Sequence, residues 1–149
     1  MISLIDLTPW ADRLKAQCPS FTNRVFKTIP DDDLSIDAHE SPVAFIYLSS
    51  DRSGQNGVVG SIRQAVDTLI TVEIVVRRTA TATDKFNEAA SDTLRSARIE
   101  VLNALVGWKP ADCKYPVLHS HGELKQKQPK VLKFAESFSV ENDFIKPRV

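Results

Sequence analysis

The sequence predicts an α+β fold: a single mixed or antiparallel sheet of about four strands, with a long helix packed on it and a shorter N-terminal helix. Alternation of apolar and polar residues over 64–78 predicts a long strand, and apolar residues three or four apart over 84–106 predict a long helix. All eight prolines lie outside these two segments. A chain of 149 residues fits a single domain, residues 1–149.

Both helices have boundary signals. Thr8 followed by Pro9 has the form of an N-cap with proline at the first helical position, and Pro19 ends this helix at about Cys18. Gly107 is placed to cap the long helix. The narrow apolar stripe of the long helix favours a position across one face of a sheet.

The remaining strands are shorter or less regular. Residues 43–48 are apolar on both alternating faces, which is typical of an interior strand. Further strands are expected over 115–121 and 131–144, and a short strand or turn followed by a solvated loop over 20–41. Glu136 interrupts the apolar face of the last strand and, if buried, needs a partner such as an arginine. The polar segment 49–61 holds three of the five glycines and is interpreted as a mobile hairpin-like loop.

Composition excludes several classes of protein. Nineteen basic and nineteen acidic residues give a formal net charge of zero, so no overall field draws the molecule to nucleic acid or to an anionic membrane. Two cysteines are too few for a disulfide framework and indicate a reducing cytoplasm. No apolar run is long enough to span a bilayer. We expect no cofactor and no sequence-specific contact with nucleic acid.

Candidate catalytic groups are few. His119 and His121 would point the same way on a strand, with Glu123 in phase and Cys113 nearby, so a zinc site of a small metal-dependent hydrolase could be built from them. Cys113 with either histidine would make a nucleophile pair, but no third orienting group is marked. We favour the simpler interpretation that these are polar residues at a strand end.

Two further patterns are weak as ligand sites. The glycines at 54, 57 and 60 lack the Gly-Lys-Ser/Thr ending of a phosphate-binding loop and precede a strand. Consecutive aspartates could bind a divalent cation but are more often a solvated loop, and the local lysine stretch lacks interleaved aromatic residues. In a neutral chain the two charged segments instead offer complementary surfaces for head-to-tail contact between copies: Asp31, Asp32 and Asp33 against Lys125, Lys127 and Lys130.

Strand length points to self-assembly. A strand of a dozen residues at the edge of a small sheet would expose many unpaired backbone groups, which a partner should cover. Repeated head-to-tail contacts make either a closed ring or a filament. The residues alone therefore predict a self-assembling α+β module.

The order of elements and several short segments resemble the tail terminator proteins of long-tailed bacteriophages. The likeness covers residues 40–144 and includes a Leu-x-Gly-Trp-x-Pro exit from the long helix. The segments that carry it are Pro42–Leu48, Arg63–Val66 leading into Thr71–Val76, Asn103–Pro110, Gly122–Leu124 and Phe134–Phe138.

This resemblance implies a structural protein without enzymatic activity. It would form a ring, usually a hexamer, that caps the finished tail tube, stops its polymerisation and meets the head-side connector. The protein would then lie at the head-proximal end of the virion tail, after assembly in the host cytoplasm. Another head-tail joining, completion or tail-adaptor protein is the alternative. The candidate contacts with the tube or a neighbouring copy are Arg52, Gly54, Gln55, Asn56, Gly57, Arg63, Asp67, Glu73 and Arg77.

Overall fold

The computed structural model describes residues 2–30, 41–78, 83, 88–127 and 130–147. Its two α-helices and one mixed sheet confirm the α+β class. The sheet has five strands instead of about four, because the chain at 25–26 adds a two-residue parallel strand. In chain order the elements are α1 (Thr8–Gln17), the 3-10 turn η1 (Pro19–Phe21), β1 (Val25–Phe26), β2 (Val43–Ser53), β3 (Ile62–Arg77), α2 (Glu88–Leu105), β4 (Leu118–Lys127) and β5 (Val131–Lys146).

The long strand lies at the centre of the sheet, not at an edge. The strand order is β1-β2-β3-β5-β4, and β3 pairs antiparallel with β2 on one side and with β5 along all sixteen of its residues on the other. The expectation that β3 exposes unpaired backbone is therefore wrong, because β5 is equally long. The outer edges belong to β4 and, beyond the short β1, to β2.

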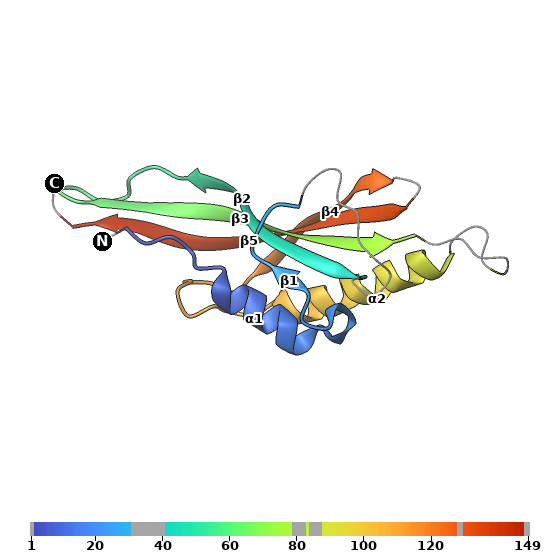
Figure 1. The fold of residues 1–149 in the computed structure, drawn as a ribbon. Coiled ribbons are helices and arrows are strands. Elements are labelled where there is room, and N and C mark those ends of the chain that lie inside the picture. The colour runs from blue at the N-terminus through green and yellow to red at the C-terminus, as the bar shows by residue number, and fades with distance from the viewer. Residues whose placement is uncertain (1, 31–40, 79–82, 84–87, 128–129, 148–149) are drawn as a thin grey trace.

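Both helices cover the same face of the sheet (Figure 1). The core forms between them and the even-numbered residues of β3, whose predicted apolar face is confirmed from Ile70 to Val76. Trp10 and Leu14 of α1 and Val101 of α2 are fully buried in it. We call the opposite side of the sheet the open face; it carries the odd-numbered residues of β3.

The N-terminal helix begins one residue earlier than its capping signal suggested. Thr8 is the first helical residue, and Leu7 stands at the N-cap without a side-chain bond. The Asp6 carboxylate instead accepts the Thr8 N–H at 2.9 Å, and this backbone bond lowers the pKa of Asp6. Pro19 begins the next turn, so α1 ends at Gln17 as predicted.

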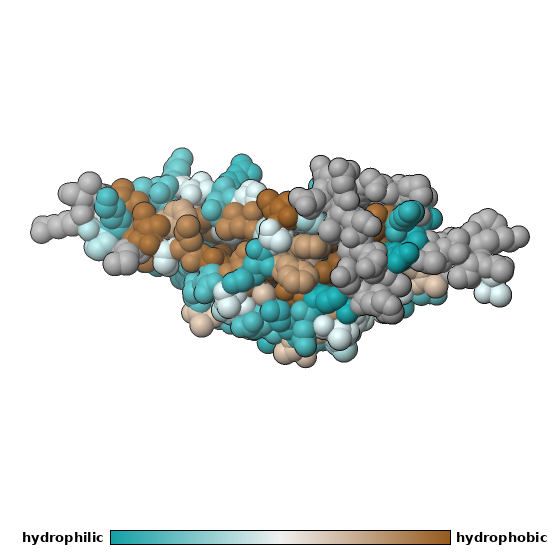
Figure 2. All heavy atoms as spheres, viewed as in Figure 1, coloured by the Kyte–Doolittle hydropathy of each residue, from teal (hydrophilic) through white to brown (hydrophobic). Residues whose placement is uncertain are grey.

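One end of the sheet extends beyond both helices (Figure 1). We call this part, residues 50–67 and 141–147, the arm. Strand β2 continues to Ser53, so the loop predicted over 49–61 is reduced to residues 54–61. The apolar pattern stops at Leu48 because no helix covers the strand beyond that point, and all residues from 49 to 53 are exposed. Figure 2 shows hydrophobic residues continuing along the arm between polar ones.

Candidate functional site

The end of the arm is a hairpin loop held by one asparagine side chain. Asn56 donates its amide to the carbonyls of Val58 and Ser61 at 3.0 and 3.1 Å, and its Oδ1 accepts the Arg63 N–H at 2.8 Å. Gln64 adds a bond to the Gly54 carbonyl at 2.9 Å. We call residues 54–61 the tip. The tip presents two valines to solvent: Val58 is 38% exposed and Val59 is fully exposed.

Three of the predicted contact residues meet on the arm. Arg52, Gly54 and Asp67 line a hollow of about 280 Å³ together with Glu141. Asp67 stands directly opposite Arg52 on β2 and opposite Glu141 on β5. Two carboxylates placed opposite each other across strands repel, so a cation near both would stabilise this pair.

Asp143 connects the arm to the body through Lys114 and binds Arg63 within the arm. The Asp143 carboxylate accepts hydrogen bonds from Lys114 at 3.0 Å and from Arg63 at 3.2 Å. The Lys114 bond is the main reason that the pKa of Asp143 is lowered, and Arg63 acts in the same direction. Asn142 adds a bond to the Asp112 carbonyl at 2.8 Å, so the loop before β4 is fixed to the base of the arm.

A groove of about 300 Å³ crosses the middle of the open face. Hydroxyl groups from three strands form its floor: Ser49 of β2 bonds to Thr71 of β3, and Thr71 lies 3.1 Å from the hydroxyl of Ser137 on β5. Ile29, Leu69 and Ala135 form its apolar lining, and β4 contributes polar side chains.

A second bond on this face connects Tyr47 to Glu73. The Tyr47 hydroxyl donates to Glu73 Oε1 at 2.6 Å. Burial is the main reason that the pKa of Tyr47 is raised, and the bond to the carboxylate raises it further. Glu73, one of the predicted contact residues, is only 8% exposed, so most of its surface is already covered.

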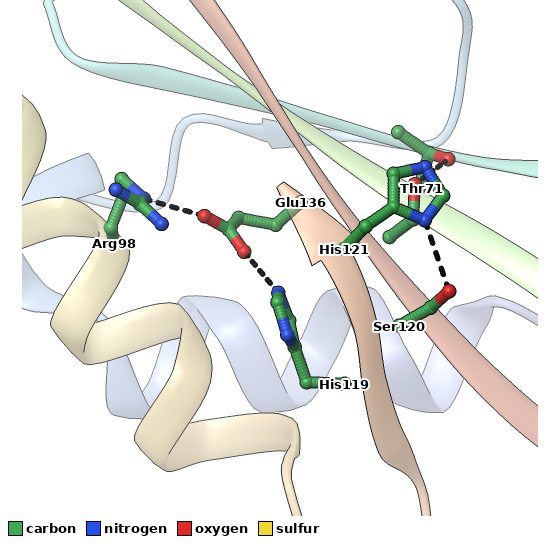
Figure 3. Close-up of polar contacts among 7 residues, drawn as sticks. Thr71, Arg98, His119, Ser120, His121 and Glu136 are labelled. Atoms are coloured by element: carbon green, nitrogen blue, oxygen red, sulfur yellow. Dashed lines mark hydrogen bonds and ion pairs between the residues drawn. The ribbon is translucent and has the colours of Figure 1, made fainter. Parts of the chain in front are cut away.

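On the helix side, Glu136 is fully buried between the side chains of Arg98 and His119 (Figure 3). Arg98 of α2 lies 2.5 Å from Glu136 Oε1, and His119 Nε2 of β4 lies 2.6 Å from Oε2. The Arg98 guanidinium also lies over the Phe134 ring at 4.0 Å from its centroid. The expectation that a buried Glu136 needs an arginine is confirmed.

The two histidines do not point the same way. A register shift in β4 leaves Ser120 as an extra residue, so His119 pairs with Phe138 and His121 with Ser137. Adjacent residues of β5 face opposite sides of the sheet, and therefore His119 points to Glu136 whereas His121 lies on the open face (Figure 3). The geometry assumed for the zinc alternative is wrong, and within the described residues no three His, Cys, Asp or Glu side chains are grouped to hold a metal.

Both cysteines are buried thiols. Cys113 bonds to Asp112 at 3.6 Å and not to a histidine, which removes the proposed nucleophile pair. Burial raises the pKa of Cys18 and of Cys113 to about 12. Thiolate is the reactive form, so neither group is activated at neutral pH.

The remaining predicted residues lie apart from each other. Gln55 and Gly57 belong to the exposed tip, whereas Arg77 is half-buried at the far end of β3. Lys125 is exposed and lies 3.5 Å from Glu123, and Lys130 is exposed before β5. The acidic segment Asp31–Asp33 lies outside the described residues, as does the side chain of Lys127.

The groove, and the two exposed valines of the tip, were not predicted as sites. Thr71 and Ser137 were a weak indication of the groove in the sequence, since they occupy positions out of phase with the apolar face of their strands. Val58 and Val59 were a similar indication of the tip, as the apolar pair inside a polar loop. Neither described helix is both long and apolar enough to cross a membrane.

Comparison with known proteins gives one strong match. The family model described as phage tail terminator protein matches residues 1–148. No curated protein matches significantly. Among solved structures, a chain of "Virion of native gene transfer agent (GTA) particle" is similar over 93% of this chain and 90% of that chain, with 14% identity and a TM-score of 0.48. A similarity at that level carries no argument about function.

Proposed function

We propose a specific role for this chain from the premise that it belongs to the phage tail terminator family, whose model matches residues 1–148. The protein is a structural component of a phage tail. In our proposal, copies form a ring, expected to be hexameric, that caps the finished tail tube, ends its polymerisation and offers the joining surface to the head-side connector. The family match over nearly the whole chain carries this proposal, and residues 1–149 act in it as one assembly unit.

The geometry supports contact between different surfaces of neighbouring copies. The two free edges of the sheet belong to strands of different sequence, β4 and the outer part of β2. Contacts between unlike surfaces close into rings when the rotation permits. A bulge interrupts each of these edges, at Ser49 in β2 and at Ser120 in β4, which limits simple edge-to-edge pairing.

The arm is the proposed region of contact. It projects beyond the helices and carries most of the candidate contact residues: Arg52, Gly54, Gln55, Asn56, Gly57, Arg63 and Asp67. Glu73 and Arg77 lie on the same strand but outside the arm. The charged segments at 31–33 and 125–130 are a second proposed contact between copies.

Native mass spectrometry and electron microscopy test this role. Purified protein should form a ring, alone or on the tube, and should appear as extra density at one end of tubes assembled from the tail tube protein. Tubes should stop lengthening when the chain is added during assembly, while tubes without it continue. A protein that stays monomeric, leaves tube ends bare and does not affect their length would contradict the proposal.

The alternative is another joining component, such as a head-completion or tail-adaptor protein. It shares the prediction of virion association but differs in position. Density for the chain that lies on the connector and does not touch the tube would favour this alternative.

A further inference from the structure

We propose that the tip of the arm of one copy docks into the open-face groove of a neighbouring copy. The inference deepens the proposed ring and rests on it, since it names the two surfaces that meet. It commits to a second copy of this chain as the occupant of the groove.

The tip is already shaped for docking. Asn56 fixes it through bonds to Val58, Ser61 and Arg63, so little conformational freedom is lost when it binds. Its last turn uses Gly60 at φ +82°, and an added Cβ there would meet nothing within 4 Å, so the glycine serves backbone conformation and not close packing. The result is a fixed loop that holds Val58 and Val59 out in solvent.

The groove matches the tip in chemistry. Its apolar side, with the half-buried Leu69 and with Ile29, which is 66% exposed, can receive the two valines. Its floor of hydroxyl groups and the imidazole of His121 can bond to the backbone groups of a glycine-rich loop. At about 300 Å³ it is at the lower end of the size range of ligand pockets, which suits a loop tip better than a folded element.

The absence of charge on both surfaces is compatible with the same pairing. No charged residue occurs from Ser53 to Ser61. The floor of the groove is likewise uncharged, and at its rim Lys125 and Glu123 already lie 3.5 Å apart. Docking would therefore bury no unpaired charge. Burial of an unpaired charge would weaken the interface strongly, because the charge would lose its hydration.

The tip cannot reach the groove of its own chain. Both are carried by β3, and nine residues separate Ile62 beside the tip from Thr71 in the groove, a distance of about 30 Å at ~3.3 Å per residue. The groove must then be filled from another molecule. A contact from the tip to a different surface on the next copy is heterologous, which is the type of contact that a ring needs.

Cysteine cross-linking tests the contact directly. Copies with Val59→Cys are co-assembled with copies carrying Ile29→Cys, at an exposed position that lines the groove, and are then oxidised. A covalent dimer should form in the mixture, and the double variant should give a ladder of higher species, whereas each single variant alone should not. Cys18 and Cys113 are buried and contribute little background. Val59→Cys mixed with Ile99→Cys, an exposed position on α2, is the matched control.

A measurement of self-association affinity provides a second test. Val59→Asp would place a charge in the groove and should weaken self-association at least about tenfold, with an unchanged melting temperature. Ile99→Asp, at an apolar residue of the helix layer that is 42% exposed, should leave association unchanged.

The outcomes separate this inference from the proposed ring. If the ring forms normally with Val59→Asp and Val59→Cys gives no cross-link to Ile29→Cys, the docking is overturned and the ring is left intact. A cross-link from Val59→Cys to the tube protein and not to a second copy also overturns it. Absence of any oligomer, free or on tubes, overturns both.

Discussion

Glu136 is the residue most dependent on its neighbours. It has no exposed surface, and a buried carboxylate is tolerated only where cations and hydrogen bonds replace water. Arg98 and His119 provide both from two different elements, so the ion cluster ties α2 to β4. Edge strand β4 is otherwise held in the sheet by β5 alone.

Removing the arginine should therefore destabilise the protein more than removing the whole ion pair. Arg98→Met leaves Glu136 buried with His119 alone and should lower the free energy of unfolding by about 2–4 kcal/mol. The double variant Arg98→Met/Glu136→Leu should recover a large part of this loss. Urea denaturation at pH 7 measures both, with exposed Arg95→Met as the control on the same helix. A double variant less stable than Arg98→Met would contradict this account.

Gly122 is present because of the same cluster. A Cβ at this position would lie 2.8 Å from Phe134 Cε1 and 3.0 Å from Glu136 Oε1. Gly122→Ala should cost about 1–3 kcal/mol of stability, since both neighbours would have to shift. Gly54→Ala is the control, because its nearest contact would be 3.6 Å and its stability should be nearly unchanged in the same thermal melt.

The two thiols should be unreactive in the folded protein. Their pKa of about 12 keeps them protonated at pH 8, whereas the unfolded thiols ionise near 9. The contribution of these two buried thiols to the free energy of unfolding is therefore complete below pH 9. It falls as pH rises towards 12, because the thiols of the unfolded state lose their protons first. A thiol reagent at pH 8 should modify native protein slowly and denatured protein at both cysteines. Rapid modification of folded protein would show that burial is incomplete.

At the scale of elements, the sequence predicted the strand and the helix that each bury one face in the core. The alternation that ends at Arg77 and the helical spacing that ends at Leu105 reflect packing on the shared core, and both elements were found at those ends. The extension of β2 from Leu48 to Ser53 could not be predicted, since a strand exposed on both faces needs no apolar period.

The site was less predictable for related reasons. The bulge at Ser120 separates His119 from His121, and a one-residue insertion in strand register leaves no mark in the composition. The groove depends on hydroxyl groups from three strands that are brought together only by pairing. Tip residues Gly54 and Asn56 were expected as contacts from the family resemblance, but the bonds that fix the tip follow from the fold.

The tip can be loosened without unfolding the body. Asn56→Ala removes three side-chain bonds in a loop that lies outside the core, so the melting temperature should change by no more than about 2 °C. Amide hydrogen exchange of residues 54–63 should become faster, while that of β3 from Ile70 to Val76 stays unchanged. An equal slowing or acceleration in both regions would show that the tip is not an independent element.

For the whole molecule, a net charge of zero makes contacts between copies independent of any global field. The two proposed contacts then compete: the uncharged tip in the groove, and the opposite charges of segments 31–33 and 125–130. They respond differently to salt, because ions screen exposed charges beyond about 10 Å at 0.1 M but hardly affect apolar burial.

Salt dependence therefore decides which contact dominates the ring. If the tip and groove provide most of the affinity, the association constant should change less than about threefold between roughly 50 and 500 mM NaCl. Sedimentation velocity across a dilution series measures it, and Lys127→Gln/Lys130→Gln, which changes the basic segment but not the Lys125 of the groove rim, should behave like the unmodified chain. A loss of tenfold or more at high salt, reproduced at low salt by the lysine variant, would assign the contact to the charged segments, because only screened attraction fades with both changes.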